Sequence, residues 1–318
     1  MKTILVIGAS GQLGSVLVQE LHKMYGMDRV IASDLRFDPS FQGRFIGFDA
    51  TDFDKMIKVV EENHVNEIYH MAAILSASGE EFPLNTWDIN MKSFFNVLEA
   101  ARLCNVKKVF FPSSIAVFGE GVKRLKTPQN SPLIPTTVYG MSKVAGENWA
   151  NYYYKKYNLD VRSLRYPGII GHQSMPGGGT TDYAIDIFHK AVKHEPFKCF
   201  LESTTALPMM YMEDCIRATI ELMHAPIENI AIRTSYNLAG VSFSPKQLAS
   251  AIKRVIPKFE IKYDPDFRQE IAENWPMSID DTQAKNDWKW KPKYNLEMIT
   301  KIMIKELEKK YKNELVHH

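Results

Sequence analysis

The chain has 318 residues, of which 24% are charged and 45% are hydrophobic. This balance is typical of a soluble globular protein with one large or two modest domains. The formal net charge of +2 is too small to indicate a nucleic-acid surface. No run approaches the roughly 18 apolar residues of a membrane-spanning helix. We therefore expect no nucleic-acid partner and no membrane insertion.

The N-terminal segment "MKTILVIGASGQLG" begins like a signal peptide, but glycines interrupt its apolar run and no small-residue cleavage site follows. We expect it to belong to the mature fold of a cytoplasmic protein. The three cysteines, Cys104, Cys199 and Cys215, are far apart and lack CxxC spacing. This pattern argues against a disulfide framework or a cysteine-based zinc site, and we expect no metal.

Short apolar runs alternate with helical patterns through the first half of the chain. The runs are "TILVIG", "RVIASD", "RFIGFD", "EIYHMAA", "KVFFPSS" and, later, "VRSLRYPGIIG". Helical patterns lie between them at Gln12–Met24, Asp52–Asn63, Trp87–Cys104 and Thr137–Tyr157. Alternating strands and helices predict an α/β fold, a doubly wound parallel sheet covered by helices on both faces.

Beyond Gly171 the alternation becomes less regular. Helices are predicted from Asp182, around Glu213–Met223, in "PKQLASAIKRVI" and at Leu296–Lys312, with a short strand in "SYNLAG". We see no internal repeat and no low-complexity linker. We therefore expect a nucleotide-binding domain over residues 1–171, with its core continuing in part beyond, and a smaller, partly interleaved substrate lobe over residues 172–318.

Gly8, Gly11 and Gly14 form a GxxGxxG pattern between the first strand and the first helix. Such glycines allow a tight turn, the close approach of a pyrophosphate and close helix–strand packing, and the helix N-terminus attracts phosphates. Asp34 ends the next strand, 20 residues after Gly14. A carboxylate there accepts the ribose hydroxyls and repels a 2′-phosphate, which predicts NAD. Arg36 nearby favours NADP instead, and a plain glycine turn with an exposed aspartate is the structural alternative.

Tyr139 and Lys143 lie four residues apart on a predicted helix, so their side chains share one face. An ammonium beside the phenol, together with a positive nicotinamide ring, would bring the tyrosine pKa down from about 10 toward working pH. Ser113 and Ser114 end a strand, where ligands bind in open parallel sheets. Tyr/Lys pairs are also common on solvated helix faces, so the pair is informative only together with the strand-end serines.

Together, GxxGxxG, Asp34, the strand-end serine and the YxxxK pattern resemble the extended short-chain dehydrogenase/reductase superfamily. The resemblance covers nearly the whole chain and implies a Rossmann fold. It also implies that Tyr139 is the general base, that Lys143 lowers its pKa and holds the nicotinamide ribose, and that Ser114 polarises the substrate hydroxyl. Ser113 would share that task, and Asn90 would orient the active-site helix and its lysine.

The full set of residues expected to contact NAD follows from the strand ends and this resemblance. Asp49 ends a strand where its side chain can face the adenine, but a helix cap explains it equally well. The small residues after "YH" suit a backbone segment that runs beside a cofactor. The set is Gly8, Gly11, Gln12, Leu13, Gly14, Asp34, Leu35, Arg36, Asp49, Ala50, Met71, Ala72, Ala73, Asn90, Tyr139, Lys143, Tyr166 and Ile169.

The substrate region departs from the nucleotide-sugar branch of the superfamily. The chain reads "RYPGIIG" where that branch usually has R-x-F-N, and it lacks an Arg-Asp pair before "LPMMYMEDCIRATIELM". With "PGGGTTDYAIDIFH", these segments look like the short-chain type of L-threonine 3-dehydrogenase. This resemblance implies NAD-dependent oxidation of L-threonine to 2-amino-3-oxobutyrate by a homodimer. The subunits would pair in a four-helix bundle of the helices at Trp87–Cys104 and Thr137–Tyr157.

Threonine is a small zwitterion, so its site must hold a carboxylate and an ammonium. Thr180 with helix-end amides suits the carboxylate, and Ser76, in the loop after "HMAA", would join it. Asp182 would pair with the ammonium or shape the loop. The expected substrate contacts are Ser76, Ser114, Tyr139, Gly178, Thr180, Thr181 and Asp182. The alternative is that Thr180 to Asp182 only cap a helix.

Three other functions stay open at this point. One is a nucleotide-sugar 4-epimerase or dehydratase with altered contacts. The second is a non-catalytic NAD-binding sensor, which would not depend on Tyr139. The third is a zinc-dependent threonine dehydrogenase, whose cysteine, histidine and glutamate ligands we do not find in the sequence.

Overall fold

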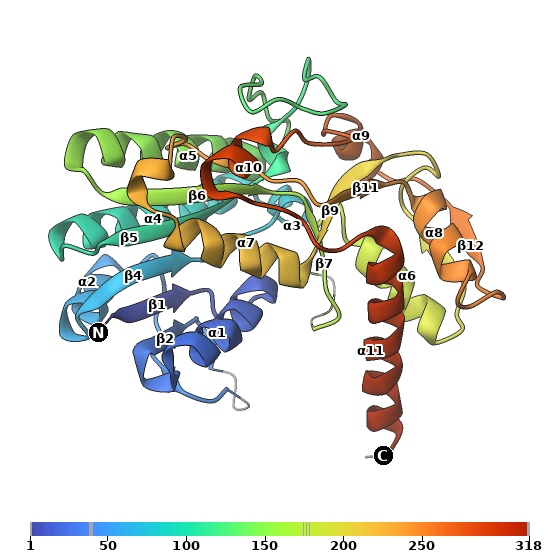
Figure 1. The fold of residues 1–318 in the computed structure, drawn as a ribbon, viewed down its shortest axis with the longest axis horizontal. Coiled ribbons are helices and arrows are strands. Elements are labelled where there is room, and N and C mark those ends of the chain that lie inside the picture. Colours follow the sequence, from blue (N-terminus) through green and yellow to red (C-terminus); the bar gives the residue numbers. More distant parts are fainter. Residues whose placement is uncertain (1, 38–40, 174, 176, 178, 317–318) are drawn as a thin grey trace.

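The computed structural model describes residues 2–37, 41–173, 175, 177 and 179–316. Its main layer is a seven-stranded sheet in the order β10-β6-β5-β4-β1-β2-β3, with parallel pairing throughout. Helices cover both faces, so the predicted doubly wound α/β fold is confirmed (Figure 1). The strands are β1 (Thr3–Ile7), β2 (Val30–Ser33), β3 (Arg44–Phe45), β4 (Val65–His70), β5 (Lys108–Ser114), β6 (Asp160–Tyr166) and β10 (Tyr236–Asn237).

The two faces of this sheet bury separate hydrophobic clusters. Alternate residues of β1 divide between them, with Ile4 and Val6 in one and Leu5 and Ile7 in the other, as the two-residue period of a strand requires. The first cluster packs against α1 (Gln12–Tyr25), α7 (Met212–His224) and α10 (Thr282–Trp288). The second packs against α2 (Phe53–Glu62), α4 (Pro83–Leu103) and α5 (Val138–Tyr157).

A smaller lobe with its own hydrophobic core lies beside the carboxyl end of the sheet (Figure 1). It contains the three-stranded sheet β11-β9-β7 and the pair β12-β8. Its elements are β7 (Gly168–Ile170), α6 (Tyr183–Val192), β8 (Phe197–Cys199), β9 (Leu207–Tyr211), β11 (Val241–Phe243), α8 (Pro245–Lys253), β12 (Ile261–Tyr263), α9 (Arg268–Glu273) and α11 (Leu296–Val316). Short connecting helices are η1 (Met27–Arg29), α3 (Ser76–Gly79), η2 (Ile115–Val117) and η3 (Ile227–Asn229).

The run "VRSLRYPGIIG" forms two strands where one was predicted. Pro167 separates β6 from β7 and has no N–H to donate to a strand ladder, so β6 joins the large sheet and β7 the small one. The run "RFIGFD" is likewise shorter than predicted, because β3 covers only Arg44–Phe45 at the sheet edge. Since β10, α7 and α10 come from beyond residue 171 yet pack on the large sheet, the division at that residue stays a prediction.

The glycine-rich turn after β1 is a place of very close backbone contact. Gly8 has a φ of +84°, and a Cβ there would lie 2.5 Å from the Ala72 nitrogen. A Cβ on Gly14 would lie 2.1 Å from the Gly8 carbonyl oxygen. No larger residue fits either position without moving the backbone, so α1 approaches β1 and β4 more closely than side chains would permit.

The substitution Gly14→Ala tests this close approach. The new methyl group would push α1 away from the turn, and we expect a loss of about 1–3 kcal/mol of unfolding free energy, as for other overpacked sites. The matched control is Gly47→Ala, whose Cβ would meet its nearest neighbour at an ordinary 3.6 Å. Thermal unfolding of the two variants measures the difference. Equal stability of both would show that the turn has room to adjust.

Candidate active site

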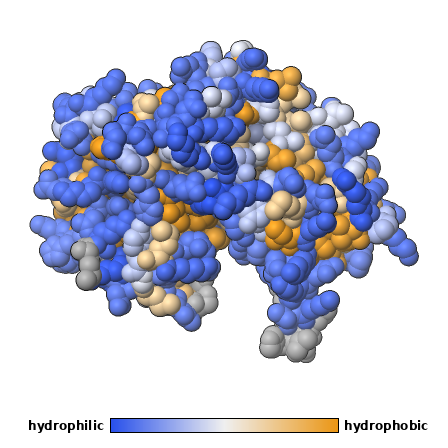
Figure 2. Space-filling view, viewed as in Figure 1, coloured by the Kyte–Doolittle hydropathy of each residue, from blue (hydrophilic) through white to orange (hydrophobic). Residues whose placement is uncertain are grey.

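A cavity of about 140 Å³ lies where the carboxyl ends of the strands meet the smaller lobe, and we call it the serine–tyrosine cavity. Figure 2 shows the molecular surface notched between the sheet-bearing part and the lobe that ends in α11. The lining comes from both parts. It consists of Gln12, Leu13, Met71, Ala73, Leu75, Ser76, Pro112, Ser113, Ser114, Ile115, Tyr139, Lys143, Tyr166, Pro167, Gly168, Ile169, Gly179, Thr180, Thr181, Asp182 and Trp275.

A second concave region, of about 270 Å³, lies beside the glycine-rich turn, and we call it the glycine-turn groove. It shares Met71 and Ala73 with the serine–tyrosine cavity, so the two adjoin. Its other lining residues are Ile7, Gly8, Gly11, Asp34, Leu35, Phe48, Asp49, Ala50, Thr51, Ala72, Ile74, Ile89 and Ser93. An elongated ligand spanning both would run from the end of β2 to the end of β5.

Asp34 faces the glycine-turn groove from the end of β2. Its Oδ2 accepts a hydrogen bond from the Ser10 amide at 3.0 Å, and its Oδ1 accepts one from the Leu35 amide at 2.8 Å. A carboxylate can accept about four hydrogen bonds, so both oxygens retain capacity for ribose hydroxyls. Arg36 is exposed and does not line the groove, so the charged side chains in the lining, Asp34 and Asp49, are both carboxylates.

The N-terminus of α1 suits a pyrophosphate. Its N-cap residue is Gly11, and no side chain caps its first amides. The buried Nε2 of Gln12 has no hydrogen-bond partner among the described residues and lies in the lining of the serine–tyrosine cavity. Unpaired amide donors at the positive end of a helix dipole are favourable partners for phosphate oxygens. With the turn that only glycine can form, these donors fit a dinucleotide.

Asp49 and Asn90 have defined structural contacts. Asp49 Oδ1 accepts hydrogen bonds from both the amide and the hydroxyl of Thr51 at 2.8 Å, so it stabilises the turn before α2 while it lines the groove. Asn90 Oδ1 accepts from the Ile74 amide at 2.8 Å, and its Nδ2 donates to the Ile74 carbonyl at 3.1 Å. Its Nδ2 also lies 3.4 Å from Ser142 Oγ. Asn90 therefore fixes the segment after β4 beside α5, consistent with an orienting role.

Ser114, Tyr139 and Lys143 come together in the serine–tyrosine cavity. The Ser114 hydroxyl at the end of β5 lies near enough to the Tyr139 phenol to act on its pKa, which burial raises and this hydroxyl lowers. Lys143, one turn later on α5, places its Nζ 5.3 Å from the centre of the Tyr139 ring and 4.7 Å from that of Phe111. Thr137 caps the N-terminus of this helix, and its hydroxyl accepts a hydrogen bond from the Gly140 amide at 3.1 Å. The two residues of the YxxxK pattern and the strand-end serine thus share one site.

Burial dominates the electrostatics of this pair. It raises the pKa of Tyr139 to about 12, with the Ser114 hydroxyl acting in the opposite direction. It lowers the pKa of Lys143 to about 7. Low-dielectric surroundings disfavour both charged forms, and the predicted lowering of the tyrosine pKa by Lys143 together with a nicotinamide ring stays a prediction. Further positive charge in the cavity is needed to make Tyr139 an effective base near neutral pH.

Two predicted site residues direct their hydroxyls away from the cavity. The buried Ser113 hydroxyl donates a 2.6 Å hydrogen bond to Glu147 Oε1. The Tyr166 hydroxyl is hydrogen-bonded to that of Thr219. Both residues still line the cavity, as does Ile169. Sharing of the Ser114 task by Ser113 stays a prediction that these contacts do not favour.

The loop before α6 separates the roles of Thr180 and Asp182. Asp182 is the N-cap residue, but its side chain makes no capping bond; Oδ2 instead accepts from the amides of Gly177 and Gly179, both at 2.8 Å. Thr180 is 1% exposed, and its hydroxyl has no partner among the described residues. Since a buried hydroxyl is normally hydrogen-bonded, Thr180 is available to a ligand and does not cap the helix.

The other expected substrate contacts differ in how well the structure describes them. Thr181 lines the cavity and packs on Gly168, where an added Cβ would lie 2.7 Å from the Thr181 Cβ. Ser76 lies buried in the same lining at the start of α3. Gly178 lies outside the described residues.

Trp275 is a cavity residue that the sequence reasoning missed. It is 4% exposed, lies just after α9, and its indole Nε1 has no partner among the described residues. Arg124 fixes its backbone by donating from Nε to the Trp275 carbonyl at 3.0 Å. No motif surrounds Trp275, and only the packing of a distant segment brings it here. The one available signal was the residue type, because a buried tryptophan usually needs a hydrogen-bond partner for its indole N–H.

No group of three histidine, cysteine, aspartate or glutamate side chains is arranged for a metal ion within the described ranges. Over the same residues, no helix is long and apolar enough to cross a membrane. The cytoplasmic location expected from the sequence stays a prediction.

The fold and the two adjoining concave regions define a dinucleotide-dependent enzyme of the Rossmann type. The model of the NAD-dependent epimerase/dehydratase family matches residues 4–239, and the chain belongs to this family. NAD is therefore its cofactor, in agreement with the prediction from Gly8–Gly14 and Asp34. An uncharacterized epimerase/dehydratase of Staphylococcus aureus strain USA300 is 43% identical over 315 residues, which cover 98% of both chains.

Solved structures confirm the narrower resemblance. A GalE-like L-threonine dehydrogenase from Cupriavidus necator, in its holo form, is 50% identical, with a TM-score of 0.94 over 96% of this chain and 99% of that one. A monomeric L-threonine 3-dehydrogenase from a metagenome, in its apo form, is 44% identical, with the same TM-score of 0.94 over 96% and 99% of the two chains.

Replacement of Lys143 by methionine tests the cost of burying its ammonium. In the unfolded chain lysine titrates near 10.4, whereas folding lowers the pKa of Lys143 to about 7. Between these values the unfolded state binds more protons, so the wild type gains stability as pH rises through this window. We expect Lys143→Met to melt above the wild type at pH 7, with the gap closing toward pH 10.

The control for this experiment is Lys155→Met, which changes an exposed lysine on the same helix. It should show no comparable dependence on pH. Thermal unfolding without ligand across pH 6–10 provides the measurement. A Lys143→Met variant that is less stable than the wild type at pH 7 would mean that the ammonium has favourable contacts outweighing its desolvation.

Proposed function

We propose that the protein oxidises the 3-hydroxyl of L-threonine with NAD and forms 2-amino-3-oxobutyrate. The observation that carries this proposal is the buried, unpartnered hydroxyl of Thr180 in the same cavity as the Ser114–Tyr139 pair. The cavity, at about 140 Å³, is smaller than the roughly 300–1,000 Å³ of sites for drug-sized ligands, which favours a small substrate. The solved relatives named as threonine dehydrogenases support the same choice.

In the proposed reaction Tyr139 removes the proton of the threonine hydroxyl while Ser114 holds that hydroxyl by a hydrogen bond. When bound in the adjoining groove, NAD supplies the hydride acceptor and a positively charged ring. Lys143 lies beside Tyr139, and its ammonium stabilises the developing phenolate. Because the Tyr139 pKa of about 12 is a property of the protein alone, proton removal depends on positive charge gathered around the phenol.

The polar ends of threonine would be held by groups that have no partners among the described residues. Within that part of the chain the Thr180 hydroxyl and the Trp275 indole N–H are both buried and unpaired, and both can donate to a carboxylate. Ser76 lies in the same lining. The contacts of Asp182 with two loop amides favour its loop-shaping role, and through this role it would place Thr180.

The subunit arrangement is also a proposal. Aromatic side chains remain exposed on α4 and α5, with Trp87 38%, Trp149 37% and Tyr152 42% exposed, and the two helices pack together on one face of the sheet. A homodimer formed through this face would bury them in a four-helix bundle. The monomeric relative shows that an L-threonine 3-dehydrogenase can also occur as a single chain.

The alternatives differ in what they release. A nucleotide-sugar epimerase regenerates its cofactor and gives no net NADH, whereas a zinc enzyme would lose activity with a chelator. A panel of amino acids and nucleotide sugars should give steady NADH formation at 340 nm only with threonine or a close analogue, unaffected by EDTA. If none of the amino acids in the panel gives NADH, the proposal is contradicted.

The variant Tyr139→Phe tests the base within that assay. We expect kcat to fall roughly 100- to 10,000-fold, the range of general-base catalysis, with little change in the Kd for NAD. Because the phenol must lose a proton, log kcat/KM of the wild type should rise by about one per pH unit below the pKa, and the variant should lack this slope. Near-normal turnover of the variant would instead favour a sensor or another base.

The variant Thr180→Val removes a hydroxyl at nearly constant volume. A lost hydrogen bond to a charged group costs about 1.5–3 kcal/mol, or roughly a 10- to 150-fold loss in kcat/KM for threonine. Because this hydroxyl is unpaired in the protein alone, thermal stability without ligand should be unchanged or higher.

A true capping residue provides the matched control. Ser244 caps α8 in a capping box with Gln247, so Ser244→Ala should lose about 1 kcal/mol of stability and keep its kinetics. The proposal for Thr180 fails if its variant behaves like Ser244→Ala.

A further inference from the structure

A buried ion pair lies directly behind the active-site helix. Arg165 on β6 donates from Nε to Glu147 Oε1 at 2.9 Å and from Nη2 to Oε2 at 2.7 Å. The two side chains are 4% and 1% exposed. Ser113 donates to the same Oε1 at 2.6 Å. Neither charged residue lines the serine–tyrosine cavity, so the proposed chemistry does not use them directly.

The position of this pair along the chain is informative. Glu147 lies one helical turn after Lys143 and two turns after Tyr139 on α5. Ser113 is the residue before Ser114 on β5. The three contacts therefore join the helix that carries the base to the strand that carries its serine partner, and both to the neighbouring strand β6.

Arg165 makes further hydrogen bonds outside the ion pair. Arg165 Nη1 donates to the Asn237 side-chain oxygen at 3.1 Å and to the Gln129 carbonyl at 3.0 Å. The backbone amide of Asn237 in turn donates to Gln129 Oε1 at 2.8 Å. With its donors engaged on α5, β10 and the loop before α5, Arg165 has a fixed place, and so does the carboxylate it holds.

The packing between α5 and β5 gives little directional control of its own. At Gly140 an added Cβ would lie 2.2 Å from the Ala116 carbonyl oxygen, and at Gly146 it would lie 2.3 Å from the Phe111 ring. The helix thus rests closely on β5 and the following η2 through glycines, and the apolar part of this contact is non-directional. A shift of one residue along a helix is about 1.5 Å, and a misplacement of about 1 Å can reduce a rate about 100-fold.

We propose that Glu147 is a positioning residue for the reaction and that Ser113 acts through it. The Ser113–Glu147–Arg165 network fixes α5 along β5 so that the Tyr139 phenol meets the Ser114 hydroxyl. The kinetic test of this proposal, the kcat with threonine, rests on the proposed function. The structural test, the distance between Ser114 and Tyr139, does not. Buried ion pairs add little net stability compared with apolar residues of equal volume, so the main effect of this one is on geometry.

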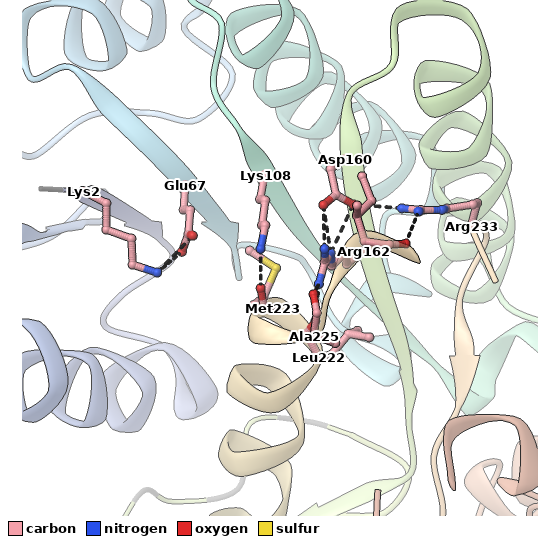
Figure 3. Close-up of polar contacts among 10 residues, drawn as sticks. Lys2, Glu67, Lys108, Asp160, Arg162, Leu222, Met223, Ala225 and Arg233 are labelled. Atoms are coloured by element: carbon pink, nitrogen blue, oxygen red, sulfur yellow. Dashed lines mark hydrogen bonds and ion pairs between the residues drawn. The ribbon is translucent and has the colours of Figure 1, made fainter. Parts of the chain in front are cut away.

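The same strand provides a matched control pair on the opposite face of the sheet. Arg162 donates from Nη2 to Asp160 Oδ2 at 2.7 Å, with side chains 0% and 7% exposed. It also donates to the carbonyls of Leu222 and Ala225 at the C-terminal end of α7 (Figure 3). Arg233 completes the cluster on Asp160 at 2.9 Å. These groups are as buried as the first pair but lie away from Tyr139 and Ser114.

Three variants test the proposal: Ser113→Ala, the double variant E147Q/R165M, and the control D160N/R162M. We expect kcat with threonine to fall about 10-fold in Ser113→Ala and about 100-fold in E147Q/R165M, the scale of a 1 Å misplacement. The Kd for NAD should change less than about twofold, since the glycine turn is untouched. The control should keep kcat within about twofold even if its melting temperature falls more.

Two further measurements separate positioning from direct catalysis and from stability. Adding Ser113→Ala to E147Q/R165M should cost less than about twofold more, because both act through one contact. Crystal structures should show the Ser114 Oγ to Tyr139 phenol distance lengthened by about 1 Å relative to the wild type in E147Q/R165M and unchanged in the control.

The inference is overturned if E147Q/R165M keeps both its kcat and this distance, or if the control loses as much kcat. Wild-type protein that releases no NADH with threonine would defeat the proposed function alone. In that case the crystallographic distance still decides the role of Glu147.

Discussion

The burial of the Lys143 ammonium is the constraint on which the rest of the site depends. Lys143 is 4% exposed, packs over the Phe111 ring and makes no ion pair among the described side chains. Its pKa of about 7 measures how strongly the surroundings disfavour charge. Nearby His70 is subject to the same conditions, since burial and the Lys143 charge lower its pKa to about 3. The site is thus an apolar enclosure in which any positive charge that is present acts at close range and with little screening.

This enclosure explains how the neighbouring groups are used. Asn90, Ser113 and Tyr166 have their polar atoms engaged by the scaffold, whereas Thr180, Trp275 and Gln12 leave donors unpaired at the surface of the cavity. A buried unpaired polar group costs stability, and three of the twelve such atoms among the described residues lie on residues that line this cavity. Within the cavity, this difference separates residues whose polar atoms build the site from residues whose polar atoms are available to ligands.

Much of the fold and part of the site could be predicted because their signals are local. The turn of Gly8 to Gly14, the carboxylate of Asp34 and the Tyr139–Lys143 spacing each depend on a few adjacent residues, and strand ends follow from short apolar runs. Trp275 and the Glu147–Arg165 pair depend on segments brought together over long sequence distances, for which a single sequence has no signal. The role of Thr180 was ambiguous because a threonine before a helix reads equally as a cap until its contacts are known. The rise of the Tyr139 pKa in the protein without NAD comes from burial, which no motif encodes.

The break between strands at Pro167 has a consequence for which amino-acid substitutions the protein can tolerate. It is where the chain leaves the large sheet after β6 and enters the small one at β7, and residues on both sides of it line the serine–tyrosine cavity. The machinery on β5 and α5 precedes this crossing, while the loop of Thr180 follows it. Substitutions in the loop of Thr180 can therefore reshape what the cavity accepts without touching β5 and α5, which hold the serine and the tyrosine.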